Sequence, residues 1–201
     1  MSKISDNSGG PGYGAKVDSK NNLWTRAVSI PAEEDHAVDG DSYIAHGECH
    51  TAAATGGGLM SLKNNYPNKE VVITRIYIDS HTITPTDLVM VQVFEPATTT
   101  SGTDITSTGI VQKHLGKQNA AKDNLTLTIS DGSANLTYTG GTKYHAPPLP
   151  TMTSQTREMK GTNVITPNKT ILWGFKRAGG GSATDAEIVS LSVNFILRDL
   201  T

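Results

Sequence analysis

The sequence predicts an all-β protein in which two antiparallel sheets pack face to face as a sandwich. Threonine, serine, glycine and valine are abundant among the 201 residues, whereas segments with the apolar period of an amphipathic helix are scarce. Short apolar runs are separated by clusters of glycine, proline and asparagine, a pattern typical of strands joined by turns. A chain of this length buries a substantial core without help from a metal or a disulfide.

The clearest hairpin lies between residues 59 and 80. The segment NNYPN supplies turn residues between LMSLK and VVITRIYIDS. Strict alternation in the second strand places Val72, Thr74, Ile76 and Ile78 on one face and Val71, Ile73, Arg75 and Tyr77 on the other. Both faces are then largely apolar. We therefore expect a central strand whose outer side is also covered, for example by a neighbouring subunit.

Eight further segments are predicted to be strands. They begin at Leu23, Ser42, Leu88, Gly109, Leu125, Ala134, Thr170 and Glu187. The last is the clearest, because Val189, Leu191, Val193, Phe195 and Leu197 alternate with polar residues, as in an inner, central strand. Residues 98–108, 139–154 and 177–186 are rich in glycine, proline and threonine and are expected to be connections. One short helical turn is expected around residues 117–122.

The number of strands and the long connections favour a jelly-roll-like sandwich, with an immunoglobulin-like sandwich as the alternative. Cys49 is the only cysteine, so the disulfide of antibody-type domains is absent, which weakens that alternative. Residues 1–22 are rich in glycine and have few apolar side chains. We expect them to form a flexible N-terminal arm ahead of a single domain, residues 23–201.

Charge and hydropathy argue against several classes of partner. The formal net charge is −2 and only 18% of residues are charged, so no basic surface for nucleic acid or an anionic membrane is predicted. No segment approaches the roughly 18 apolar residues of a membrane span, and the first residues lack the apolar core of a secretory signal. We expect a soluble protein made in a cytoplasm.

The sharpest chemical motif is HGECH, residues 46–50. It places His46, Glu48 and His50 on one face of a strand, which is a spacing suited to a three-ligand metal site. A cupin-like metalloenzyme would use such a site, but the flanking glycine and second-strand histidine of cupin sites are missing. Polar residues on a solvent face produce the same pattern, and we expect no bound metal.

No other pattern predicts catalysis. His81, His114 and His145 have no serine, aspartate or cysteine at a diagnostic spacing, so we predict neither catalytic residues nor a cofactor. Cys49 is expected to be a small core residue and not a nucleophile. Trp24 and Trp173, with several tyrosines, are interpreted as core or interface residues, with a sugar-binding platform as the alternative.

A resemblance emerges from the order of several segments. They are the segment from Ala15 to Glu48, LMSLKNN followed by VVITRIYID, YTGGTKYHAPPLP, and NKTILWGFK. This order resembles small β-sandwich virion proteins of tailed bacteriophages, particularly capsid decoration or cement proteins, over most of residues 15–198. The resemblance implies a jelly-roll-like subunit, commonly a homotrimer, that binds the outer face of a phage capsid and stabilises the shell. It implies no catalytic residues.

The implied partner is the major capsid protein or another virion protein, and the implied location is the virion, after assembly in the host cytoplasm. Related sandwiches occur in tails and head fibres, so a carbohydrate-binding or receptor-binding module remains the alternative. Candidate partner-binding residues are Pro11 and Tyr13 in the arm, Tyr77 in the hairpin, and Pro147 and Pro148 in the HAPPLP segment.

Overall fold

The computed structural model describes residues 16–17, 23–24, 41–51, 56–80, 88–113, 124–148, 154–177 and 188–200. The chain divides into two compact units, Met1–Pro31 and Ala32–Thr201. In the first unit, β1 (Lys16–Val17) pairs with β2 (Leu23–Trp24) in antiparallel register. Most of the expected arm lies outside the described residues, so its boundary at residue 22 stays a prediction.

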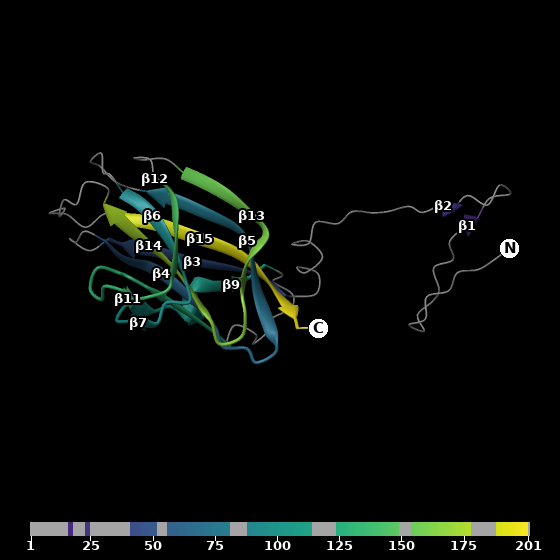
Figure 1. Cartoon of the computed structure of the whole chain (residues 1–201), viewed down its shortest axis with the longest axis horizontal. Coiled ribbons are helices and arrows are strands. Elements are labelled where there is room, and N and C mark those ends of the chain that lie inside the picture. The colour runs from purple at the N-terminus through teal and green to yellow at the C-terminus, as the bar shows by residue number, and fades with distance from the viewer. Residues whose placement is uncertain are drawn as a thin grey trace. The chain divides into compact units, whose positions relative to one another are not determined.

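The second unit is a sandwich of two antiparallel sheets, which confirms the predicted fold class (Figure 1). The five-stranded sheet has the order β13 (Ser154–Ile165), β5 (Lys69–Ser80), β15 (Ile188–Asp199), β3 (Ser42–His50) and β9 (Ile110–Gln112). The six-stranded sheet has the order β12 (Thr142–Pro148), β6 (Leu88–Phe94), β14 (Thr170–Arg177), β4 (Gly56–Asn64), β10 (Leu125–Ile129) and β8 (Thr103–Asp104).

The connectivity is that of a jelly roll. From β3 to β6, and again from β12 to β15, each successive strand crosses to the opposite sheet. The hairpin predicted for residues 59–80 is therefore wrong, because β4 and β5 belong to opposite sheets and do not pair with each other. The resulting orders, β3-β15-β5-β13 and β4-β14-β6-β12, place the last strand beside the first and the second-last beside the second. This is the double Greek-key arrangement of eight antiparallel strands.

An insertion between β6 and β12 widens this eight-strand framework at one side. Its strand β9 extends the sheet beyond β3, while β10 and β8 extend the other sheet beyond β4. A short helix, α2 (Thr106–Gly109), lies between β8 and β9, and the strands β7 (Thr98–Thr100) and β11 (Thr137–Thr139) pair as a ribbon. The helical turn expected at residues 117–122 lies outside the described residues.

One apolar layer fills the space between the sheets. Its largest fully buried side chains include Trp173 and Phe175 from β14, and Tyr43 and Phe195, whose rings stack with centroids 5.5 Å apart. The alternation predicted for the last strand is confirmed, because its five apolar residues from Val189 to Leu197 all lie in this layer. Cys49 is also part of the layer, as expected.

A second, smaller apolar cluster covers the outer face of the six-stranded sheet. Leu136, from the insertion, packs on Val91, Val93 and Leu172. The backbone amide of Gly58 donates a hydrogen bond to the Leu136 carbonyl over 2.9 Å. A Cβ atom at Gly58 would lie 2.8 Å from the Leu136 side chain, so glycine permits this close approach.

The prediction that residues 71–78 carry an apolar face on each side is wrong, because β5 contains a bulge at Thr74. Asn194 of β15 pairs with Arg75, but the next residue, Phe195, pairs with Ile73. Because Thr74 is an extra residue, the side chains that face the core are the odd-numbered ones before it and the even-numbered ones after it. The inner face of β5 therefore holds Val71, Ile73, Ile76 and Ile78, all in the main core.

The expected connections at residues 98–108 and 139–154 are wrong as well. The first contains β7 and β8, and the second contains all of β12 and the start of β13. Both β12 and β13 are edge strands, where glycine and proline are tolerated because one side of the strand needs no ladder partner. The composition that indicated a loop therefore belongs to the edge of a sheet.

Replacing Leu136 with alanine should lower the free energy of unfolding by about 2–5 kcal/mol, because a buried leucine is lost and a cavity is left. Chemical denaturation measures the change. Leu200→Ala is the matched control, since Leu200 is 47% exposed and its truncation should cost about 0.5 kcal/mol or less. Equal effects of the two substitutions would show that the insertion does not support the framework.

A second prediction concerns Asp131 in the turn after β10. Hydrogen bonds from the Thr103 hydroxyl (2.7 Å), the Ala134 amide (2.9 Å) and Ser133 hold the pKa of its carboxyl well below the usual range. A folded-state pKa below the unfolded value stabilises the fold above about pH 4, and this contribution is lost as pH falls further. Asp131→Asn should lower the Tm at pH 7, and the Tm difference from wild type should shrink as the pH drops below 4. A pH-independent difference would contradict this assignment.

Candidate functional site

The three polar residues of the HGECH motif lie on the outer face of β3. His46 and Glu48 are exposed and His50 is partly buried, while Gly47 and Cys49 point into the sandwich. The His46 Nδ1 lies 2.7 Å from the Ser192 hydroxyl, and the His50 Nε2 lies 3.9 Å from the Glu48 carboxylate. Among the described residues, no group of three histidine, cysteine, aspartate or glutamate side chains is placed to hold a metal ion. A cupin-like centre would require inward-facing ligands, and these side chains face outward.

The Cys49 thiol is not activated. Burial raises its pKa to about 12, and the neighbouring Glu48 carboxylate adds to the rise. A reactive cysteine instead has a lowered pKa and solvent access. The interpretation of Cys49 as a core residue is therefore confirmed.

The structure excludes two residues from a sugar-binding platform. Trp173 and Tyr43 are almost completely buried in the main core, so neither ring offers a face to a ligand. The side chains of Trp24 and Tyr144 lie outside the described part of the molecule. Any carbohydrate site in the described residues must therefore use other side chains.

Tyr77 is a different kind of aromatic residue, because it is exposed and held in place. It lies on the outer face of the five-stranded sheet, with 37% of its surface exposed. Arg75 donates a hydrogen bond to its hydroxyl over 3.0 Å and lies 5.9 Å from its ring centre. The same guanidinium is bound to Glu158 of β13 over 2.9 Å. Arg75 therefore restrains the Tyr77 side chain, and Glu158 in turn fixes the position of Arg75.

The other candidate partner-binding residues are less well defined. Pro11 and Tyr13 lie outside the described residues. Pro147 and Pro148, expected in a loop, belong instead to β12, and Pro148 pairs with Val89 of β6 after a register shift. This places them on an edge strand. Their part in partner binding stays a prediction, because their side chains are not described.

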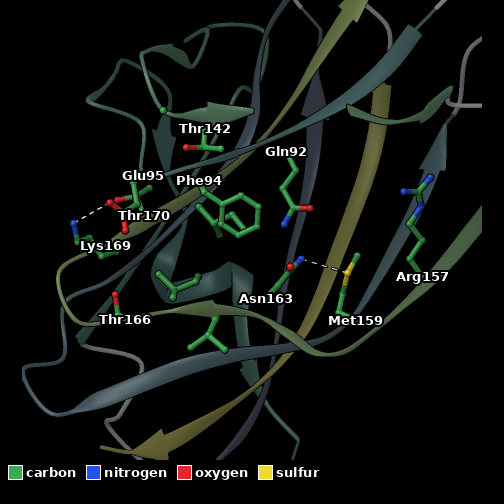
Figure 2. Close-up of a pocket in the computed structure, with 14 residues that line it drawn as sticks. Gln92, Phe94, Glu95, Thr142, Arg157, Met159, Asn163, Thr166, Lys169 and Thr170 are labelled. Carbon is green, nitrogen blue, oxygen red and sulfur yellow. Dashed lines mark hydrogen bonds and ion pairs between the residues drawn. The ribbon is translucent and has the colours of Figure 1, made fainter. Parts of the chain in front are cut away.

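Sequence reasoning missed a cleft of about 1040 Å³ among the described residues. It lies between strand β13 of one sheet and strands β6, β12 and β14 of the other (Figure 2). Phe94 and Ile171 form part of its apolar wall. The cleft lies at the side of the sandwich where β12 and β13 are edge strands, opposite the side that the insertion widens.

Three polar side chains enter the cleft from inner-face positions. Gln92 alternates with Met90, a core residue, so it points between the sheets. On β13, Arg157 pairs with the core residue Ile76, and Asn163 pairs with Ile73, which places both on the inner side. In Figure 2 the amides of Gln92 and Asn163 point toward each other from opposite walls.

A large irregularity in β13 accompanies these polar residues. Glu158 pairs with Arg75 and Asn163 pairs with Ile73, so residues 159–162 lie opposite Thr74 alone. The Asn163 amide donates to the Met159 sulfur over 3.3 Å and spans this bulge. Bulges frequently re-aim side chains beside functional sites.

The two ends of the cleft differ in charge, as Figure 2 shows. At one end the Lys169 ammonium and the Glu95 carboxylate form an ion pair at 2.9 Å. At the other end is Arg157, whose pKa is lowered by burial. No hydrogen bond or ion pair joins Arg157 to another described residue. Among the described residues that line the cleft, Arg157 therefore carries the one positive charge without a paired carboxylate.

The alternation of Met90, Gln92 and Phe94 was the one sequence signal for this cleft. A glutamine at an inner position of an otherwise apolar strand indicates a polar site or an edge of the core. The residues on β13 gave no signal, because residues 155–165 were not among the segments predicted to be strands.

Comparison with known proteins adds no family. No protein-family model matches the chain, and a search of curated proteins finds no matching sequence. Within the described residues, no helix has the length and apolar character needed to cross a membrane.

The state of Cys49 leads to a direct test. In the folded protein at pH 8, a thiol-specific reagent such as dithionitrobenzoate should react slowly, because the thiol is buried and its pKa is raised. After unfolding in denaturant, one thiol per chain should react at once. Complete reaction of the folded protein within minutes would contradict the placement of Cys49.

Proposed function

We propose that this protein is a structural virion protein that binds the outer face of a bacteriophage capsid and stabilises the shell. Its role is non-catalytic, and its partner is the major capsid protein or another virion protein. The proposal starts from the ordered resemblance to decoration proteins. The jelly-roll connectivity agrees with the fold that this resemblance implies.

The observation that carries the proposal is the fixed presentation of Tyr77. Tyrosine and arginine are enriched at the centres of protein interfaces, where they supply large contact areas. Arg75, which is itself bound to Glu158, holds the Tyr77 side chain before any partner binds, so less conformational entropy is lost on docking. Tyr77 and its neighbours on the outer face of the five-stranded sheet are the proposed contact with the shell.

Two further elements belong to this proposal. The N-terminal residues 1–22, with Pro11 and Tyr13, would act as a tether along neighbouring capsid protein. The subunit would act as a homotrimer, because several simultaneous attachments convert weak contacts into tight binding. The bulge at Thr74 leaves Val72 as the one aliphatic residue of 71–78 on the outer face of β5, so the trimer now rests on the resemblance alone.

The test is occupancy on purified shells of the phage that encodes the chain. Tyr77→Ala should weaken binding by roughly tenfold per subunit, the effect of losing a contact of about 1.4 kcal/mol, and by more if the subunits bind as a trimer. Tyr77→Phe is the matched control. It keeps the ring and removes only the hydroxyl that Arg75 binds, so its loss should be smaller.

Thermal unfolding of each free variant shows whether the fold is intact, and light scattering gives the oligomeric state. If a folded Tyr77→Ala variant still occupied the shells fully, Tyr77 would not be part of the interface. Failure of the wild-type protein to bind the shells would overturn the proposed function itself.

A further inference from the structure

The cleft is lined by three polar side chains at positions that face the layer between the sheets. Elsewhere on the inner faces, the described strands fill the layer between the sheets mainly with apolar side chains, and the buried Asn64 of β4 has hydrogen-bond partners for its amide. At the β12–β13 side they supply Gln92, Asn163 and Arg157. The Gln92 Nε2 is buried and has no hydrogen-bond partner among the described residues. Buried polar atoms of Tyr43 and Trp173 also lack a partner among the described residues, but Gln92 lines the cleft, where a ligand or ordered solvent can pair with its amide.

Arg157 sets the charge of a suitable ligand. Arg157 is partly buried and pairs with Ile76 across the ladder of β13 and β5, and no ion pair joins it to a carboxylate among the described residues. The other cation of the cleft, Lys169, is already paired with Glu95. A single uncompensated charge favours a ligand with one negative group. The planar fork of arginine matches a carboxylate with two parallel hydrogen bonds.

The rest of the lining suits a hydroxyl-rich ring. Amide groups and the hydroxyls of Thr142 and Thr170 both donate and accept hydrogen bonds, as sugar hydroxyls do. Phe94 adds a partly buried aromatic surface between the two charged ends. The volume of about 1040 Å³ is sufficient for a small saccharide.

We propose that this cleft binds a carbohydrate that carries a carboxylate, such as a uronic acid or sialic acid residue, with the carboxylate at Arg157 and the ring between Phe94 and the amides of Gln92 and Asn163. This site is on the opposite side of β13 from the Glu158 and Tyr77 surface, and it does not depend on the proposed attachment to a capsid.

The rival explanation for Arg157 is protection of a sheet edge. Inward-facing charges on edge strands prevent edge-to-edge association, and β13 is an edge strand. That role predicts that loss of the charge promotes aggregation and leaves ligand binding unaffected. The carboxylate-binding role predicts a change in ligand selectivity.

The experiment titrates the folded full-length chain with methyl glucuronide and methyl glucoside, followed by protein-observed NMR. These ligands differ only in a carboxylate or a hydroxymethyl group on the same ring. The glucuronide should bind about tenfold or more tightly, because it gains a charge-assisted pair of hydrogen bonds. Arg157→Gln should reduce the affinity for the glucuronide to that for the glucoside, and Arg157→Lys should lie between. Lys176→Gln is the control, since it removes a positive charge from an exposed residue outside the cleft.

Each outcome decides the question. Selectivity for the glucuronide that is lost in Arg157→Gln and kept in Lys176→Gln supports the site. Equal binding of the two sugars, or no binding of either at millimolar concentration, overturns it whether or not the variants fold. Acetate that binds as tightly as the glucuronide overturns the carbohydrate part. Aggregation of Arg157→Gln with unchanged selectivity assigns Arg157 to edge protection.

Discussion

The apolar layer between the sheets is the constraint on which the other features depend. Strands β14 and β15 are hydrogen-bonded on both sides, and each contributes large side chains to this layer, such as Trp173 and Phe195. Because inward residues alternate with outward ones, filling the layer also decides which side chains face solvent or a partner. Tyr77 is outside because Ile76 and Ile78 are inside. His46 and Glu48 are outside because Ala45 and Cys49 are inside.

The bulge at Thr74 shows how one residue changes this distribution. Without it, Val71 and Ile73 would face away from the layer that Ile76 and Ile78 enter, and β5 would need an apolar cover on its outer side. With it, all four enter one core. The Thr74 hydroxyl donates to the Asn194 carbonyl over 3.2 Å and joins the bulge to β15. On the other side of β5, strand β13 places four residues, 159–162, opposite Thr74. This wider bulge borders the cleft.

The fold class and most central strands were predictable because their signal is local. In residues 43–50 and 188–193, buried side chains alternate with more exposed ones, so the environment of each side chain follows from its position in the alternation. The edge strands β12 and β13 were not predictable, since glycine, proline and polar residues are tolerated where a ladder has one partner. The bulge was not predictable either. In the sequence alone, Val71 and Ile73 fall on the opposite face from Ile76 and Ile78, and only the pairing of β5 with β15 shows that all four face the core.

The same limits apply to the candidate sites. The outward direction of the HGECH side chains followed from alternation, but the Arg75 and Glu158 pair that restrains Tyr77 joins strands that are 83 residues apart in sequence. The cleft was harder still to predict from the sequence, because its walls come from one strand of one sheet and three strands of the other. A glutamine between Met90 and Phe94 looks like a flaw in the core when β6 is considered alone. Beside Asn163 and Arg157 it becomes part of a polar wall, located where the inserted segment widens the opposite edge and leaves this one to β12 and β13.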